Sequence, residues 1–222
     1  MKTILRFYTK NALCLPPKLQ NDDVRFSDSF AEYFIGRYSN FGDIVFDPFA
    51  GYGTTLYAAE KLGRRAFGIE YLPERVEFIK ANLMNPECVH CGSALKLDEI
   101  KMPEVGFVLT SPPYMQKTNH PEYPFAGYEI TGQGYGDYLS DMTKIFIHIK
   151  GMLKSGGYAV VEASNLLIDG TFTPLAWDIT RAIGSVLCFR REIIIDWQSD
   201  STPAYGFGYD HSYALIFQNT EG

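Results

Sequence analysis

The chain has few cysteines, no long hydrophobic segment and no excess of positive charge. Its four cysteines are scattered over 222 residues, which excludes a disulfide framework for a domain of this size. No window is long and apolar enough to span a bilayer, and the N-terminus lacks the unbroken apolar core of a signal peptide. We therefore expect a protein of the reducing cytoplasm with no membrane partner.

The net charge is -6, from 20 Lys and Arg against 26 Asp and Glu. Phosphate contacts supply much of the affinity of nucleic-acid binders, so this balance argues against a strong stand-alone DNA-binding protein. It leaves room for a local basic cleft, for which the candidates are Arg6, Lys10, Lys18, Arg37 and Lys117. The composition, 46% hydrophobic and 21% charged, is that of an ordinary globular domain.

Short apolar runs alternate with amphipathic helical stretches. The predicted strands are residues 44–46, 65–70, 88–92, 105–110, 158–163, 192–197 and 212–217, and the predicted helices begin near residues 28, 56, 73, 137 and 173. This order predicts a Rossmann-like α/β fold with a mostly parallel, seven-stranded sheet, helices on both faces and an antiparallel C-terminal edge strand. Residues 1–21 are predicted to form an arm with one short strand near 4–7, and residues 22–222 a single domain.

A glycine-rich turn follows the first predicted strand of this domain. Residues 47–55 read DPFAGYGTT and open onto a helix, so Gly51 and Gly53 let the backbone approach a ligand that the helix N-terminus can bind. Glu70 ends the next strand, where such folds hold ribose hydroxyls. The alternative is a turn that only packs a helix onto the sheet.

A second motif, Ser111-Pro112-Pro113-Tyr114, directly follows the strand at 105–110. The two motifs in this order resemble the S-adenosylmethionine-dependent DNA amino-methyltransferases, which methylate cytosine N4 or adenine N6, and the Ser-Pro-Pro-Tyr form resembles the cytosine N4 branch. The resemblance extends from about Val24 to Phe217. It implies the class I methyltransferase fold, S-adenosylmethionine as cofactor and DNA as substrate.

The same resemblance implies the roles of individual residues. The tetrapeptide is the catalytic motif, and Ser93 departs from the acid that related enzymes place near the adenine. The residues implied to bind the cofactor are Phe26, Asp47, Pro48, Phe49, Ala50, Gly51, Gly53, Thr54, Thr55, Glu70, Tyr71, Ser93 and Ala94.

The tetrapeptide suits the chemistry of an exocyclic amine, whose lone pair is delocalised into the base. The Ser111 side chain and the Pro112 carbonyl can accept the amine hydrogens, and the consecutive prolines hold the backbone rigid. Acceptors there stabilise the positive charge that develops on nitrogen. Tyr114 offers a ring on which a flipped base can stack. The alternative interpretation is a rigid strand-to-loop exit.

Residues 115–136 form a long irregular stretch after the tetrapeptide, which favours a substrate loop. Its candidate substrate contacts are Lys117, Asn119, His120 and Tyr123, with solvated loop residues as the alternative. Upstream, Cys88 and Cys91 flank His90, but a structural zinc site needs a second ligand pair, so no metal is expected.

The sequence is also consistent with two other functions. One is methylation of a base amine in RNA, and the other is that of a non-catalytic cofactor-binding subunit. A separate target-recognition region is missing from the sequence pattern. The resemblance makes DNA the expected nucleic-acid partner. Because the target-recognition region is missing, a second copy of the chain or a separate specificity subunit is a possible further partner.

Overall fold

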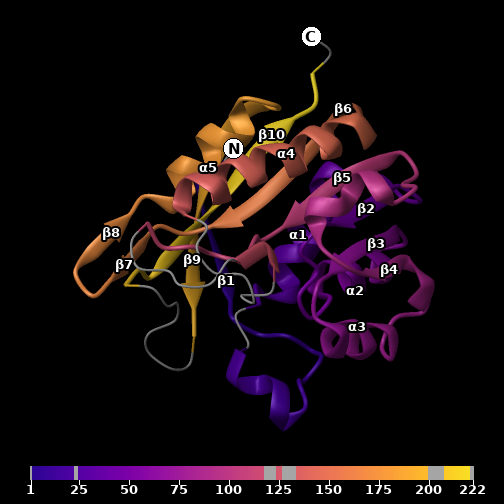
Figure 1. Cartoon of the computed structure of the whole chain (residues 1–222). Coiled ribbons are helices and arrows are strands. Elements are labelled where there is room, and N and C mark those ends of the chain that lie inside the picture. Colours follow the sequence, from indigo (N-terminus) through magenta and orange to yellow (C-terminus); the bar gives the residue numbers. More distant parts are fainter. Residues whose placement is uncertain (1, 23–24, 118–123, 127–133, 200–207, 221–222) are drawn as a thin grey trace.

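The computed structural model describes residues 2–22, 25–117, 124–126, 134–199 and 208–220 (Figure 1). Its main sheet has eight strands in the order β1-β9-β10-β6-β5-β2-β3-β4. The strands are β1 (Ile4–Tyr8), β2 (Ile44–Asp47), β3 (Arg65–Glu70), β4 (Val89–Cys91), β5 (Val105–Thr110), β6 (Leu153–Ala163), β9 (Cys188–Gln198) and β10 (His211–Gln218). All neighbours pair in parallel except β10, which is antiparallel to both β6 and β9.

Helices cover both faces of this sheet. They are α1 (Asp28–Tyr38), α2 (Thr54–Lys61), α3 (Pro73–Lys80), α4 (Tyr135–Met152) and α5 (Leu175–Gly184). Successive strand residues point to opposite faces, so Phe107 joins the core under α1, α2 and α3, whereas Val108 joins the core under α4 and α5. Short 3-10 helices lie at η1 (Pro17–Asp22), η2 (Pro86–Cys88), η3 (Ala94–Glu99) and η4 (Pro124–Ala126).

The predicted fold class is confirmed, and the seven predicted strands correspond to β2–β6, β9 and β10. Two details are corrected. The sheet has an eighth strand, because β1 of the N-terminal arm pairs with the open edge of β9 and buries Phe7 against Phe30. The antiparallel strand β10 lies between β6 and β9, not at the edge, as its buried run from Ala214 to Phe217 requires. The proposed boundary at residue 21 stays a prediction.

A second, two-stranded sheet follows β6. It is an antiparallel hairpin of β7 (Leu166–Ile168) and β8 (Thr171–Thr173), which projects from the body at the left of Figure 1. The periodicity of the sequence did not predict it, because each strand has only three residues. Within the described part of the chain, no helix is both long and apolar enough to cross a membrane.

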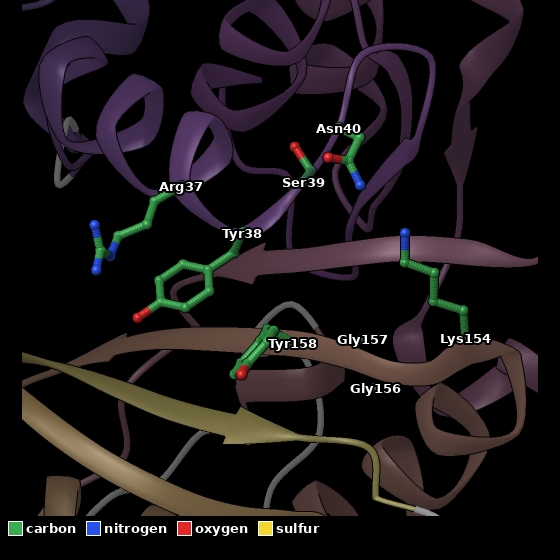
Figure 2. A pocket seen from close by; sticks show the side chains of 8 residues that line it. All are labelled: Arg37, Tyr38, Ser39, Asn40, Lys154, Gly156, Gly157 and Tyr158. Carbon is green, nitrogen blue, oxygen red and sulfur yellow. The ribbon is translucent and has the colours of Figure 1, made fainter.

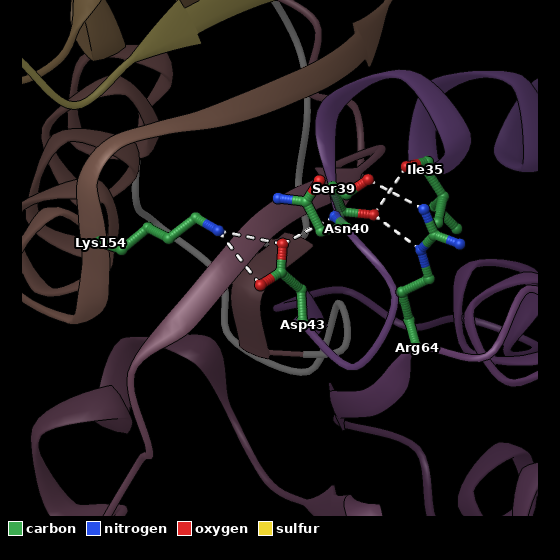
Figure 3. Close-up of polar contacts among 6 residues, drawn as sticks. All are labelled: Ile35, Ser39, Asn40, Asp43, Arg64 and Lys154. Atoms are coloured by element: carbon green, nitrogen blue, oxygen red, sulfur yellow. Dashed lines mark hydrogen bonds and ion pairs between the residues drawn. The ribbon is translucent and has the colours of Figure 1, made fainter.

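A network of polar side chains lies at the amino ends of the central strands (Figure 3). Lys154 Nζ lies 2.9 Å from Asp43 Oδ2, and the Asn40 N–H donates to the same oxygen at 2.8 Å. Arg64 donates to the Ser39 carbonyl and hydroxyl at 2.8 and 3.1 Å. Partial burial acts to raise the pKa of Asp43, but the bonds from Asn40 and Lys154 outweigh it and hold the pKa below its ordinary value. The network joins β2 to β6 at the edge opposite their carboxyl ends.

Candidate active site

The carboxyl ends of four adjacent strands carry the polar residues of the candidate site. In the order β6, β5, β2 and β3 these strands end at or near Glu162, Ser111, Asp47 and Glu70. Ligands of open α/β sheets bind along this edge. The two sequence motifs, more than fifty residues apart, therefore come from neighbouring strands.

The glycine turn between β2 and α2 is held by backbone bonds from Ala50 N to Ile69 O at 2.8 Å and from Gly53 N to Ala50 O at 2.7 Å. Gly51 and Gly53 have φ of 57° and 87°, a region that favours glycine. A Cβ on Gly53 would lie 3.0 Å from the Tyr57 ring, whereas a Cβ on Gly51 would meet no atom closer than 3.9 Å. Among the residues that the structure describes, no atom thus lies closer than 3.9 Å to this position at Gly51, so the backbone there can approach a ligand.

Glu70 is buried at the end of β3, with 7% of its surface exposed. Its Oε2 accepts from Gly51 N at 2.8 Å and its Oε1 accepts from Leu72 N at 2.9 Å. Burial raises the pKa of Glu70, against the opposing effect of these bonds and of Arg75. A carboxylate has about four lone-pair positions, so both oxygens, fixed in place, keep capacity to accept further hydrogen bonds.

Asp47 connects the glycine turn to the tetrapeptide. Its Oδ1 accepts from Thr110 Oγ1 at 2.6 Å and from Phe49 N at 3.0 Å. Thr55 of α2 adds a second link, because its hydroxyl donates to the Leu109 carbonyl at 3.3 Å. Since Thr110 directly precedes Ser111, these bonds fix the position of the tetrapeptide relative to the glycine turn.

Burial raises the pKa of Asp47 to about 6, despite the hydrogen bonds that act in the opposite direction. The folded chain therefore binds this proton more tightly than the unfolded chain, whose pKa is near 3.8. The resulting stabilisation is present below pH 3.8 and is lost as the pH rises through about 6.

Asp47→Asn should remove this pH dependence. From pH 4 to pH 7 the stability of the variant relative to the native chain should increase by about 2 kcal/mol. Urea unfolding across this range measures the difference. Asp98→Asn, at an exposed position, is the control and should follow the native curve. A difference between Asp47→Asn and the native chain that is constant with pH would contradict the assignment.

The tetrapeptide contacts an acid that the sequence did not single out. Ser111 Oγ donates to Glu162 Oε2 at 2.7 Å, and Tyr114 OH donates to the same oxygen at 3.1 Å. Glu162 lies near the end of β6 and only 3% of its surface is exposed. The sequence did contain a pattern that could have identified Glu162. It is an acid at the end of an apolar strand, as Glu70 is at the end of β3.

Two aromatic residues outside the predicted set hold this region together. Tyr138 of α4 donates to the Pro113 carbonyl at 3.0 Å. The Phe125 ring stacks on Tyr138 and on Phe49, with centroid distances of 5.0 and 5.4 Å. Ser93 donates to the Phe125 carbonyl at 3.1 Å. The predicted substrate loop is thus attached at Phe125 beside the glycine turn.

The other predicted site residues differ in their contacts and in their burial. Ser93 also caps η3 by accepting from Leu95 N at 3.2 Å, and Phe26 packs on Phe30 of α1 with centroids 5.0 Å apart. Lys117 has an exposed side chain, and its N–H donates to Thr173 Oγ1 at 3.0 Å. Pro48, Ala50 and Thr54 are buried in and beside the turn, and Ala94 is buried at the start of η3. Pro112 is buried and Tyr71 is half-buried. Asn119, His120 and Tyr123 lie outside the described residues.

Metal ligands do not gather near the Cys-x-x-Cys segment in the part of the chain that the structure describes. No group of three or more His, Cys, Asp or Glu side chains placed to hold a metal ion occurs there. Cys88 is buried, Cys91 is exposed, and the His90 ring stacks on Phe67 with centroids 4.9 Å apart. His90 thus has a packing partner.

A surface pocket lies at the opposite edge of the sheet (Figure 2). The Tyr38 and Tyr158 rings approach to 4.8 Å between centroids on one side of it. Its lining residues are Arg37, Tyr38, Ser39, Asn40, Lys154, Gly156, Gly157 and Tyr158. Because Lys154 and Glu162 lie at opposite ends of β6, this pocket is remote from the tetrapeptide and is not part of the candidate site.

Comparison with known proteins places part of the sequence in one family. Residues 17–81 match the N6/N4 family model described as DNA methylase. The type II methyltransferase M.MjaII of Methanocaldococcus jannaschii is 43% identical over 49 residues, 22% of this chain and 9% of that protein. The orphan methyltransferase M.BamHII of Bacillus amyloliquefaciens is 40% identical over 65 residues, 29% of this chain and 24% of that protein. The match therefore spans less than a quarter of either relative.

Solved structures resemble the fold over most of the chain. TrmN from Thermus thermophilus superposes with a TM-score of 0.59 at 16% identity, covering 86% of this chain and 48% of that one. A TehB-like SAM-dependent methyltransferase from Corynebacterium glutamicum has a TM-score of 0.57 at 14% identity, covering 92% and 93%. At such identities the likeness concerns the fold alone. Residues 17–81 thus resemble the DNA amino-methyltransferases, and the fold of the chain is that of the class I methyltransferases.

Proposed function

We propose that this protein transfers a methyl group from S-adenosylmethionine to an exocyclic amino group of a base in DNA, with cytosine N4 as the target. The observation that carries the proposal is the hydrogen bond of 2.6 Å between Thr110 and Asp47. It ties the tetrapeptide at the end of β5 to the glycine turn at the end of β2. A donor seated at the turn and a base held at the tetrapeptide would share one edge of the sheet.

The residues at the turn suit the cofactor. S-adenosylmethionine, when bound, supplies an electrophilic methyl group on a sulfonium. Glu70 has two fixed oxygens that can accept from the ribose hydroxyls, and the backbone at Gly51 can approach a ligand. The N-terminus of α2 at Thr54 and Thr55 favours the negative charge of the methionine carboxylate.

Ser111 is oriented to receive an amine. A serine hydroxyl has one hydrogen and two lone pairs, and the hydrogen is donated to Glu162. The lone pairs of Ser111 Oγ are then available to accept an amine hydrogen. The Pro112 carbonyl is the second proposed acceptor. We assign Glu162 a positioning role, because it acts on the amine through Ser111.

The electrostatics of this arrangement favour the transfer. In the proposed transfer the new N–C bond would form as the S–C bond of the bound cofactor breaks. Positive charge would develop on the amine nitrogen, and one of its protons would then leave to solvent. Preorganised acceptors stabilise that charge. The carboxylate of Glu162 strengthens Ser111 as an acceptor, because chains of hydrogen bonds polarise one another.

The choice of target and partner follows from the motif and the loops. An uncharged residue heads the tetrapeptide, as in the cytosine N4 branch that it resembles, whereas adenine N6 and RNA base amines are the alternatives. The loops 115–136 and 198–210 are short for reading a long DNA sequence. We therefore propose that sequence selection is weak or that it depends on a second copy or a partner chain.

One experiment separates these possibilities. The protein is incubated with methyl-labelled S-adenosylmethionine and duplex DNA, single-stranded DNA, tRNA, rRNA or free nucleosides, and the methylated base is identified by mass spectrometry. N4-methylcytosine in DNA is the expected product, and Ser111→Ala should form it much more slowly. N6-methyladenine as the product would show that adenine N6 is the target. Label found only in RNA would show that RNA is the substrate. Cofactor binding without any transfer would identify a non-catalytic subunit and overturn the proposal.

A further inference from the structure

The hairpin of β7 and β8 projects from the body, and the proposed chemistry does not use it. Its turn consists of Asp169 and Gly170, with φ of 50° and 74°. Two consecutive residues with positive φ are typical of the tight two-residue turn whose backbone twist matches the twist of the strands that it joins. Leu167 pairs with Phe172 across the two strands. The two side chains therefore stand side by side on the hairpin.

The base of this hairpin is fixed to the candidate site. Leu166 and Thr173 are each 1% exposed. Thr173 Oγ1 accepts from the Lys117 N–H at 3.0 Å, three residues beyond Tyr114. Asn165, which precedes β7, accepts from Ala176 N of α5 at 3.1 Å. The chain reaches Leu166 only four residues after Glu162, so the hairpin extends the catalytic edge of the sheet.

Beyond this buried base, the hairpin presents apolar side chains to solvent. Leu167 is 47% exposed and Phe172 is 50% exposed. Neither side chain carries a charge that could bind a phosphate. Two half-exposed side chains also form a patch far smaller than the roughly 800 Å² per partner of a stable protein interface. Their size and chemistry suit the faces of stacked bases.

We propose that Leu167 and Phe172 form an apolar wedge that enters the base stack of duplex DNA beside the target base. This inference rests on the proposed function. An amino group inside a duplex cannot reach Ser111 unless its base leaves the stack. Apolar side chains inserted between base steps unstack them and occupy the gap. The anchors at Thr173 and Asn165 hold the wedge at a constant distance from the tetrapeptide.

The test compares the native chain with the double variant Leu167→Ala and Phe172→Ala on three substrates of one sequence. These are a matched duplex, a duplex with a mismatch at the target base, and the single strand. Transfer to the matched duplex should fall roughly 10- to 100-fold, because the cost of unstacking is no longer offset. Transfer to the single strand should be unchanged, and the mismatch should restore most of the loss.

Met84→Ala is the matched control, since Met84 is 79% exposed and lies beyond α3, away from the hairpin. It should behave as the native chain on all three substrates. Equal losses on duplex and single strand, or no loss on the duplex, would overturn the wedge. Thermal unfolding of the double variant should match the native chain.

A readout independent of transfer separates this inference from the proposed function. Duplexes with 2-aminopurine at several positions become more fluorescent when bases unstack. The native chain should increase this fluorescence and the double variant should not. If the native chain unstacks bases in this way yet methylates none, the proposed function fails and the wedge stands. If native chain and double variant give the same fluorescence, the wedge is wrong whatever the activity.

Discussion

Glu162→Gln is expected to slow methyl transfer by about 10²- to 10³-fold, the range found when one preorganised electrostatic partner is removed from an active site. Glutamine keeps the size of the side chain and an oxygen that can accept from Ser111 and Tyr114, but it removes the negative charge. The affinity for S-adenosylmethionine should not change, because Glu162 accepts from Ser111 and Tyr114 of the tetrapeptide, whereas the proposed cofactor contacts lie at the glycine turn and Glu70. Single-turnover rates and calorimetric titration measure the two quantities separately.

A double-mutant cycle distinguishes positioning from a merely structural role. If Glu162 acts through Ser111, the loss in Ser111→Ala combined with Glu162→Gln should be much smaller than the sum of the single losses. Glu99→Gln is the control, because Glu99 is exposed and pairs with Lys96 at 3.9 Å. Additive losses, or a native rate in Glu162→Gln, would show that the 2.7 Å contact has no part in the transfer.

Glu70→Ala is expected to weaken S-adenosylmethionine binding by at least about 100-fold. Hydrogen bonds to a charged group contribute about 1.5–3 kcal/mol each, and the proposed ribose contact has two of them. Glu70→Gln keeps one acceptor oxygen, so its loss should be smaller. Calorimetric titration with the cofactor measures both affinities.

Stability must be measured on the same variants. Glu70→Ala also leaves the N–H groups of Gly51 and Leu72 without this acceptor, which costs about 1–3 kcal/mol for each buried group. Titrations are therefore made well below the unfolding temperature of each variant. Glu74→Gln, at an exposed position in the first turn of α3, is the matched control and should bind as the native chain does. Native affinity in Glu70→Ala would remove Glu70 from the site.

The sequence predicted the elements whose signals are local. The strand at β5 is an unbroken buried run that ends at a proline pair, and α2 begins directly after a glycine turn. The sequence did not predict the hairpin of β7 and β8, because three-residue strands have too short a period to recognise. It also placed β10 at the edge, because strand order between β6, β9 and β10 depends on pairing between distant segments.

Within the candidate site, the sequence by itself determined the glycine turn, Glu70 and the Ser-Pro-Pro-Tyr tetrapeptide, since each is a short pattern at the end of a predicted strand. Only the tertiary structure decided that Glu162 bonds to Ser111, that Thr110 bonds to Asp47, and that Phe125 packs on Phe49. The physical reason is that sheet order makes β6, β5 and β2 neighbours. Side chains 51 and 63 residues apart meet there, and no local pattern records such contacts.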